Sequence, residues 1–188
     1  MKYLTLILHI CTIAIAIVYI SSFSVSFCIC KNDTMRIDSF NYKGMKISNV
    51  EEYKKLTNTS PFERFKHIVA NNEKMLLLNY TGAFSLGLSP VILTSFNGFI
   101  FGSYIGVYSN YMSMDKILKY TLPHSFELIA IIFSGGEGLF IGISLILCLL
   151  GYKKIKDINL KKIAVHFIFC TVIIILAAFV EAYITMSL

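Results

Sequence analysis

The sequence predicts an all-α, polytopic membrane protein with about five transmembrane helices and one amphipathic interfacial helix. Of its 188 residues, 56% are hydrophobic and only 15% are charged, whereas a soluble domain carries about 25% charged residues. The apolar residues also occur in blocks of roughly 20, the length that a helix needs to cross a hydrocarbon core of about 30 Å. The short alternating segments that are typical of a membrane β-barrel are missing from the sequence.

The first 60 residues are expected to form an anchor and a loop. Residues 1–27 hold the first apolar block, which we interpret as an uncleaved transmembrane anchor rather than a signal peptide, because it is long for a signal peptide and no clear cleavage site follows. Residues 28–60 are polar, and they are too few to build a core of their own. They are therefore predicted to form a polar extracytoplasmic loop.

A helix is predicted to begin at Pro61. Ser60 is a good N-cap, Pro61 suits the first helical position, and Glu63 completes a capping box. Downstream, apolar residues fall on one face, and Arg64, His67, Asn71 and Lys74 fall on the other. This pattern is typical of a helix that lies on the bilayer surface.

Residues 75–108 are too long for one crossing and short for two. Pro90 and the pair Asn97-Gly98 interrupt them, so we expect two short helices in a hairpin, with a re-entrant pair as the alternative. Glycines also recur every four residues, at 98, 102 and 106 and again at 138 and 142. Such stripes let helix backbones approach closely in lipid, either within the chain or between copies in a homo-oligomer.

The last two spans are predicted at about 124–150 and 163–186, separated by a loop with five lysines and one aspartate. By the positive-inside rule this loop is cytoplasmic, which places the N-terminus in the cytoplasm and the C-terminus outside the cell membrane. The nine Lys and Arg residues of the predicted outer segment 28–74 conflict with this orientation.

The net charge of +6 comes mainly from loop lysines, so we interpret it as a topology signal and expect membrane lipids, not nucleic acid, as a partner. The five cysteines lack the spacing of a zinc motif and are interpreted as apolar packing residues.

Three ionisable residues are predicted to meet inside the membrane. His124 and Glu127 are three residues apart and share a helix face, and Glu181 lies at a similar depth when residues are counted from the ends of the last two spans. Glu137 is about 15 Å deeper than Glu127. A glutamate in hydrocarbon costs about 2–3 kcal/mol unless it is protonated, paired, metal-bound or hydrated.

Three interpretations of this set stay open. It is a hydrogen-bonded clamp between two helices, a catalytic site in which His124, Glu127 and Glu181 hold a divalent metal such as zinc and activate water, or a proton or ion pathway.

The chain resembles the stage II sporulation protein M family over most of residues 62–188. The resemblance rests on the segments "FERFKHIVANNEKMLLLNYTGAFSLGLSPVILTSFNGFIFGSYIG", "LPHSFELIAIIFSGGEGLFIG" and "AAFVEAYIT". The family pattern matches the pairs Asn71-Asn72 and Asn97-Gly98, the block Pro123-His124-Ser125-x-Glu127, and Glu181-Ala182. Two positions depart from it, because Ser125 replaces a usual glycine and Glu137 a usual small residue.

The resemblance implies a membrane domain over residues 61–188 and two kinds of role. One is maturation and export of a circular-bacteriocin-type peptide. Apart from the resemblance, His124, Glu127 and Glu181 themselves are expected to form either a hydrated binding site for such a peptide substrate or the centre of a metal-assisted intramembrane peptidase. The other role is a non-catalytic scaffold that recruits partner proteins, such as cell-wall hydrolases in sporulation or an export transporter. Compact size and the intact set of His124, Glu127 and Glu181 favour the first. Asn72, Asn97 and Glu137 are added as candidate binding residues, although Asn97 beside Gly98 also fits a helix cap or turn.

Overall fold

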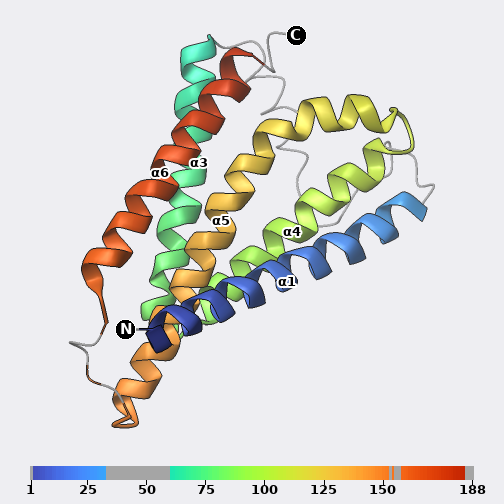
Figure 1. Cartoon of the computed structure of the whole chain (residues 1–188). Coiled ribbons are helices and arrows are strands. Elements are labelled where there is room, and N and C mark those ends of the chain that lie inside the picture. Colours follow the sequence, from blue (N-terminus) through green and yellow to red (C-terminus); the bar gives the residue numbers. More distant parts are fainter. Residues whose placement is uncertain (1, 33–59, 153, 155–157, 185–188) are drawn as a thin grey trace.

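The computed structural model describes residues 2–32, 60–152, 154 and 158–184, and it is all-α over these ranges (Figure 1). Its elements are α1 (Lys2–Asn32), α3 (Pro61–Tyr80), the short 3₁₀ helix η2 (Thr81–Ala83), α4 (Leu88–Tyr108), α5 (Met114–Leu149) and α6 (Leu160–Tyr183). The predicted fold class is confirmed. Helix α1 runs five residues past the predicted anchor boundary, and most of the predicted loop 28–60 falls outside the described residues.

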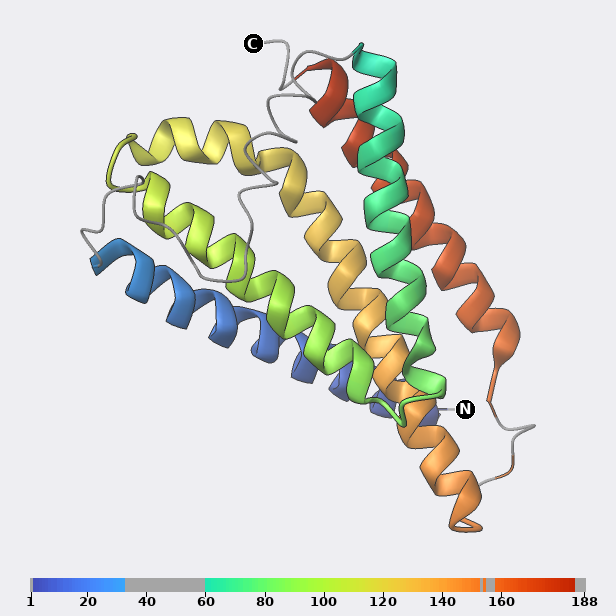
Figure 2. The ribbon, with the colours of Figure 1, turned by 180° about the vertical axis from the view of Figure 1, so that it is seen from behind.

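Four helices of the described ranges are long and apolar enough to cross a membrane, at Thr5–Asn32, Leu88–Tyr108, His124–Leu149 and Leu160–Tyr183. The chain is therefore a polytopic membrane protein. Helix α3, with 20 residues, is as long as a span but more polar. It lies alongside α5 and α6 in Figures 1 and 2, although it is not among the four candidate spans.

Helix α3 begins as the sequence predicts but packs differently. Ser60 Oγ accepts from the Glu63 N–H at 3.3 Å, and Glu63 Oε2 accepts from the Ser60 N–H at 3.3 Å, which completes the capping box. The helix does not lie apart on the surface, since Phe65 near its start contacts Phe179 and Tyr80 at its end contacts Phe167, both on α6. The polar residues on its inward face, one of them from the predicted solvated set, are Arg64, Asn72 and Asn79.

Residues 75–108 do not form the predicted pair of short helices. They hold the end of α3, the short helix η2 and one helix, α4, that is long enough to span a membrane. The chain turns between α3 and α4, where Leu86 and Gly87 take left-handed backbone angles (φ 53° and 92°) that favour glycine at the second position. Pro90 falls in the first turn of α4, where its missing N–H costs little. Helix α4 continues straight through Asn97, whose amide donates to Leu93 O at 3.1 Å, so the predicted cap or turn at Asn97 is wrong.

Both glycine stripes let helices of this chain approach one another. A side chain at position 98, 102 or 106 of α4 would collide with α1; a Cβ on Gly106, for example, would lie 2.8 Å from Phe27 O. A Cβ on Gly138 or Gly142 of α5 would collide with Asn79 of α3 or with the turn at Gly87. The predicted close packing is confirmed within the chain, and Figure 1 shows α1 and α4 side by side as a result.

Helix α5 is longer than the predicted span and changes direction within its yellow first third (Figures 1 and 2). Pro123 lies in that part of the helix, and a proline there removes one backbone hydrogen bond and bends the helix. The residues after the bend descend between α3, α4 and α6. The start of α1 and the end of α6 lie at opposite ends of the bundle.

Candidate functional site

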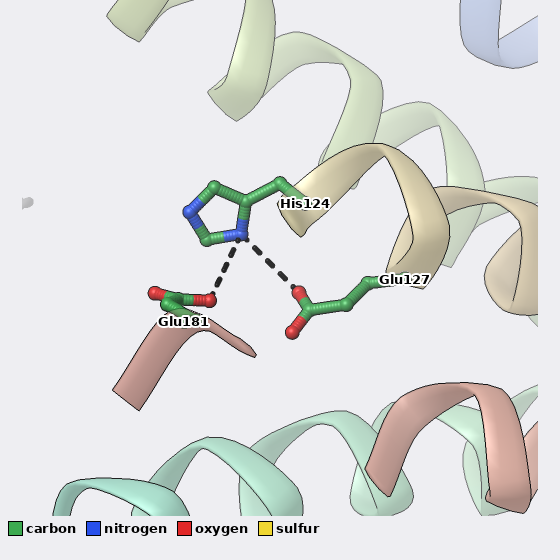
Figure 3. Close-up of side chains that lie close together, drawn as sticks. All are labelled: His124, Glu127 and Glu181. Carbon is green, nitrogen blue, oxygen red and sulfur yellow. Dashed lines mark hydrogen bonds and ion pairs between the residues drawn. The ribbon is translucent and has the colours of Figure 1, made fainter. Parts of the chain in front are cut away.

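Helices α5 and α6 bring His124, Glu127 and Glu181 together, and we call these three residues the His124 site (Figure 3). His124 Nδ1 lies 3.3 Å from Glu127 Oε2 and 3.5 Å from Glu181 Oε2. One donor atom from each of the three side chains lies within 4.8 Å of the others. The predicted convergence of the three side chains is therefore confirmed.

The two carboxyls of the His124 site are buried while the imidazole is partly open. The side chains of Glu127 and Glu181 are 8% and 7% exposed, whereas that of His124 is 40% exposed. Glu127 Oε1 and Glu181 Oε2 are buried oxygens without a hydrogen-bond partner. Leaving a buried acceptor unpaired costs about 1–3 kcal/mol, so both oxygens call for a cation or a proton.

Aromatic side chains flank the site. The ring of Phe101 on α4 meets the His124 imidazole edge to face, with centroids 6.1 Å apart. On the Glu181 side, Phe179 and Tyr183 of α6 stack at 4.7 Å and both contact Phe65 of α3. Apolar neighbours of this kind lower the local dielectric, which strengthens the attraction between the two carboxylates and any cation between them.

The donor set fits a divalent metal such as zinc. Zinc binds imidazole nitrogen and carboxylate oxygen at about 2.0–2.2 Å, and tetrahedral bonds of that length place ligand atoms about 3.3–3.6 Å apart. The two distances from His124 Nδ1 lie within this range. Two carboxylates and a neutral imidazole also carry a net charge of −2, which one divalent ion neutralises, so the loaded site avoids the cost of a buried net charge.

The remaining candidate binding residues lie outside the His124 site. Asn72 is buried on α3 and Asn97 bonds to its own helix, and no hydrogen bond of the described residues links either of them to the three. Ser125, next to His124, is exposed and donates to Thr121 O at 3.4 Å, so it does not face the site. All five cysteines are free thiols. Cys11, Cys30 and Cys170 are buried, as expected of packing residues, whereas Cys148 is partly buried and Cys28 is exposed.

Glu137 belongs to a second polar cluster that the sequence analysis missed. One of its carboxylate oxygens accepts a short hydrogen bond from the Tyr80 hydroxyl of α3, and the other makes a short contact with Nδ1 of His166 on α6. We call Tyr80, Glu137 and His166 the Glu137 site. The only signal for His166 in the sequence is an imidazole within the apolar run "IAVHFIFC".

Comparison with known proteins supports the family resemblance that the sequence motifs indicate. An uncharacterised protein of Methanocaldococcus jannaschii is 34% identical over 125 residues, which cover 64% of this chain and 70% of that protein. No solved structure matches the chain. The model of the family described as stage II sporulation protein M matches residues 5–186, so the match includes α1 as well as the three motif segments. The chain therefore belongs to the stage II sporulation protein M family.

Proposed function

We propose that the His124 site binds a divalent metal ion, zinc being the first candidate, and that the chain is a metal-assisted intramembrane peptidase. The observation that carries this proposal is the convergence of two buried carboxyls on one imidazole nitrogen. Glu127 Oε1 has no hydrogen-bond partner, and Glu181 Oε2 is held only by its 3.5 Å contact with His124 Nδ1. A clamp made only of hydrogen bonds would pair its buried acceptors. A metal ligand set needs such unpaired oxygens.

Three protein ligands leave one position of a tetrahedral metal open for water, as in catalytic zinc sites. A zinc ion held by the three ligands would act as a Lewis acid and supply hydroxide near neutral pH. His124, Glu127 and Glu181 would hold the ion, and the partly exposed imidazole marks the side from which a substrate could approach. Phe101, beside that imidazole, offers an apolar contact to the substrate.

The substrate class follows from the family resemblance and from the place of the site. We infer a peptide that is matured and exported across the cell membrane, of the circular-bacteriocin type. His124 begins the span of α5 and Glu181 lies near the end of α6, so the His124 site is at the end of the bundle opposite to where α5 ends and α6 begins. The lysine-rich loop joins those two helix ends in the sequence. If that loop is cytoplasmic, the N-terminus is cytoplasmic, the C-terminus is extracytoplasmic, and the site lies in the outer half of the membrane.

Metal analysis of the purified full-length chain tests the metal. We expect about one zinc per chain in the wild type and little or no zinc in His124→Ala. The control variant His67→Ala, on the exposed face of α3, should bind as much zinc as the wild type. Equal metal content in the wild type and His124→Ala would contradict the proposal.

Peptide analysis in the producing cells tests the reaction. Deleting the gene should remove a mature secreted peptide from the culture medium, and the wild-type gene should restore it. Glu127→Gln should not restore it, although the variant accumulates to wild-type levels. The non-catalytic scaffold makes the opposite prediction: Glu127→Gln complements the deletion, and shortening residues 28–60 between the end of α1 and Ser60 abolishes co-purification of a partner protein such as a transporter.

A further inference from the structure

The Glu137 site lies far from the His124 site on the same pair of helices. Glu137 is the fourteenth of the 26 residues in the span His124–Leu149, so it sits at mid-membrane. Along α6, His166 and Glu181 are 15 residues apart, which corresponds to about 22 Å. Between the two sites lies an apolar cluster that includes Leu76, Ala130 and Ile174, all fully buried.

The two sites also differ in how their carboxylates are satisfied. Both oxygens of Glu137 have partners, one on α3 and one on α6, whereas each acid of the His124 site keeps a buried oxygen without a hydrogen bond. A carboxylate with two donors needs no metal. The Glu137 site, with one carboxyl and one imidazole, also offers too few ligands to hold an ion.

The His166 side chain is much more exposed than the Glu137 side chain that it contacts. The side chain of His166 is 35% exposed, and that of Glu137 is 3% exposed. His166 is the seventh residue of α6, about 9 Å from the start of the helix next to the loop. Imidazole gains and loses protons in the physiological pH range. Because His166 is close to the start of α6, it is placed to link the buried acid to water at that end of the helix.

We propose that the Glu137 site is a proton-exchange site, in which Glu137 carries the proton and His166 connects it to water at the loop end of α6. On release, the Glu137 carboxyl gives its proton to His166 Nδ1 while Nε2–H gives its proton to water, and uptake is the reverse. The Tyr80 hydroxyl stabilises the ionised carboxylate that release leaves behind. An ionisable residue inside a span, with a named partner, is generally a sign of such a pathway.

The surrounding groups allow this exchange. On α6, Lys162 lies one turn before His166 and acts electrostatically on Glu137, and Cys170 lies one turn after His166. On α3, Glu73 accepts a hydrogen bond from Thr171 at 3.3 Å and acts electrostatically on Cys170. Helix α4 has no charged residue. His166 is thus the group that links Glu137 to the cationic end of the helix.

Infrared spectroscopy of the full-length chain in phosphatidylcholine vesicles tests the proposal. The difference between wild type and Glu137→Gln isolates the C=O band of a protonated Glu137, which we expect to gain intensity as the pH falls and lose it as the pH rises. Hydrogen–deuterium exchange of that carboxyl should slow about tenfold or more in His166→Gln. In Tyr80→Phe, which keeps the acid and the imidazole, the band should persist and exchange should stay fast.

Two results would overturn the proposal: no Glu137 band between about pH 5 and pH 9, or exchange in His166→Gln as fast as in the wild type. Either result would mean that the Glu137 site only holds α3, α5 and α6 together and does not exchange protons. If His166→Gln does not fold, the pH response of the band in Tyr80→Phe and in the wild type still decides the question. Zinc content is measured in parallel and should be unchanged in Glu137→Gln, so failure here leaves the metal proposal intact.

Discussion

The substitution Glu181→Gln distinguishes a metal site from a clamp. In the metal-free protein it should leave stability unchanged or raise it if the site binds a metal, and it should lower stability if the site is a clamp. The substitution conserves the shape of the side chain and turns one carboxylate oxygen into an amide N–H₂ donor. In the structure, Glu127 Oε1 is a buried acceptor without a partner at the same site. An amide donor able to reach it would recover part of the 1–3 kcal/mol that an unpaired acceptor costs.

For a metal site, metal-free Glu181→Gln should therefore be as stable as the metal-free wild type or more stable, by up to about 1 kcal/mol. Zinc at 100 times its dissociation constant should stabilise the wild type by about 2.7 kcal/mol. Loss of a residue that only hydrogen-bonds to a metal ligand weakens metal binding by about 10–100-fold, and loss of a ligand itself should weaken it at least as much. A 100-fold loss leaves only about 0.4 kcal/mol of stabilisation at the same zinc concentration.

Equilibrium unfolding of the full-length chain in mixed detergent, followed by circular dichroism with and without zinc, measures both quantities. Glu73→Gln is the matched control, because it removes a carboxylate on α3 outside the His124 site and should keep the zinc response. A metal-free Glu181→Gln that is about 2 kcal/mol or more less stable than the metal-free wild type would show that His124 bridges two carboxylates as a cation. That outcome refutes the reasoning for a metal, since loss of a buried ion-pair partner is what destabilises so strongly.

The remaining predictions concern pH and packing. Zinc affinity, measured by isothermal titration, should fall by about tenfold per pH unit once the pH is below the range in which imidazole is neutral, because protons compete for the ligands; an affinity independent of pH would argue against His124 as a ligand. Gly102→Leu should destabilise the bundle by about 1–3 kcal/mol by forcing α1 from α4, whereas Phe96→Leu on the exposed face of α4 should change it by less than about 1 kcal/mol in the same unfolding assay. Asn97→Ala should leave zinc content unchanged and alter stability by about 1 kcal/mol or less, because its amide bonds only to its own helix; a loss of zinc would restore Asn97 as a binding residue.

Residue counting was enough to predict the His124 site. His124 and Glu127 share a face because they are three residues apart, and Glu181 is close to the end of the last apolar block. Both stretches lie near the same end of the bundle, so an error of a few residues in the helix boundaries does not separate them. The prediction does not include the first part of α5, which begins at Met114, ten residues before the predicted start of the span.

Counting could not find the partners of Glu137. Glu137 lies 12 residues before the end of α5, about 18 Å, whereas His166 lies six residues after the start of α6, about 9 Å. A symmetric helix hairpin would therefore place them about 9 Å apart in depth. Figure 1 shows why they meet, since the end of α5 extends beyond the start of α6. Helix stagger is set by packing, and periodicity does not encode it.

The predicted polar face of α3 is only partly right: His67, Asn71 and Lys74 are exposed, whereas Arg64 is buried. Asn72 and Asn79, which the predicted face does not include, are buried as well. The buried face of α3 packs against polar groups of the neighbouring helix: Asn79 donates to Ile131 O and to Ser134 Oγ of α5 at 3.2 and 2.8 Å. A hydrophobic-moment argument assumes an apolar interior, and that assumption fails where a membrane bundle is held together by hydrogen bonds between helices.

Two acid–imidazole clusters on one helix pair therefore need different explanations. At the Glu137 site one acid has two donors, so its charge is satisfied by α3 and α6, and only a proton needs to move. At the His124 site one imidazole nitrogen faces two acids, so at most one of them can accept its proton, and the other still needs a cation or a proton of its own. The same residue types thus favour proton exchange at mid-membrane, where two hydrogen-bonding groups contact one acid. They favour metal binding near the end of the bundle, where one imidazole nitrogen contacts two acids.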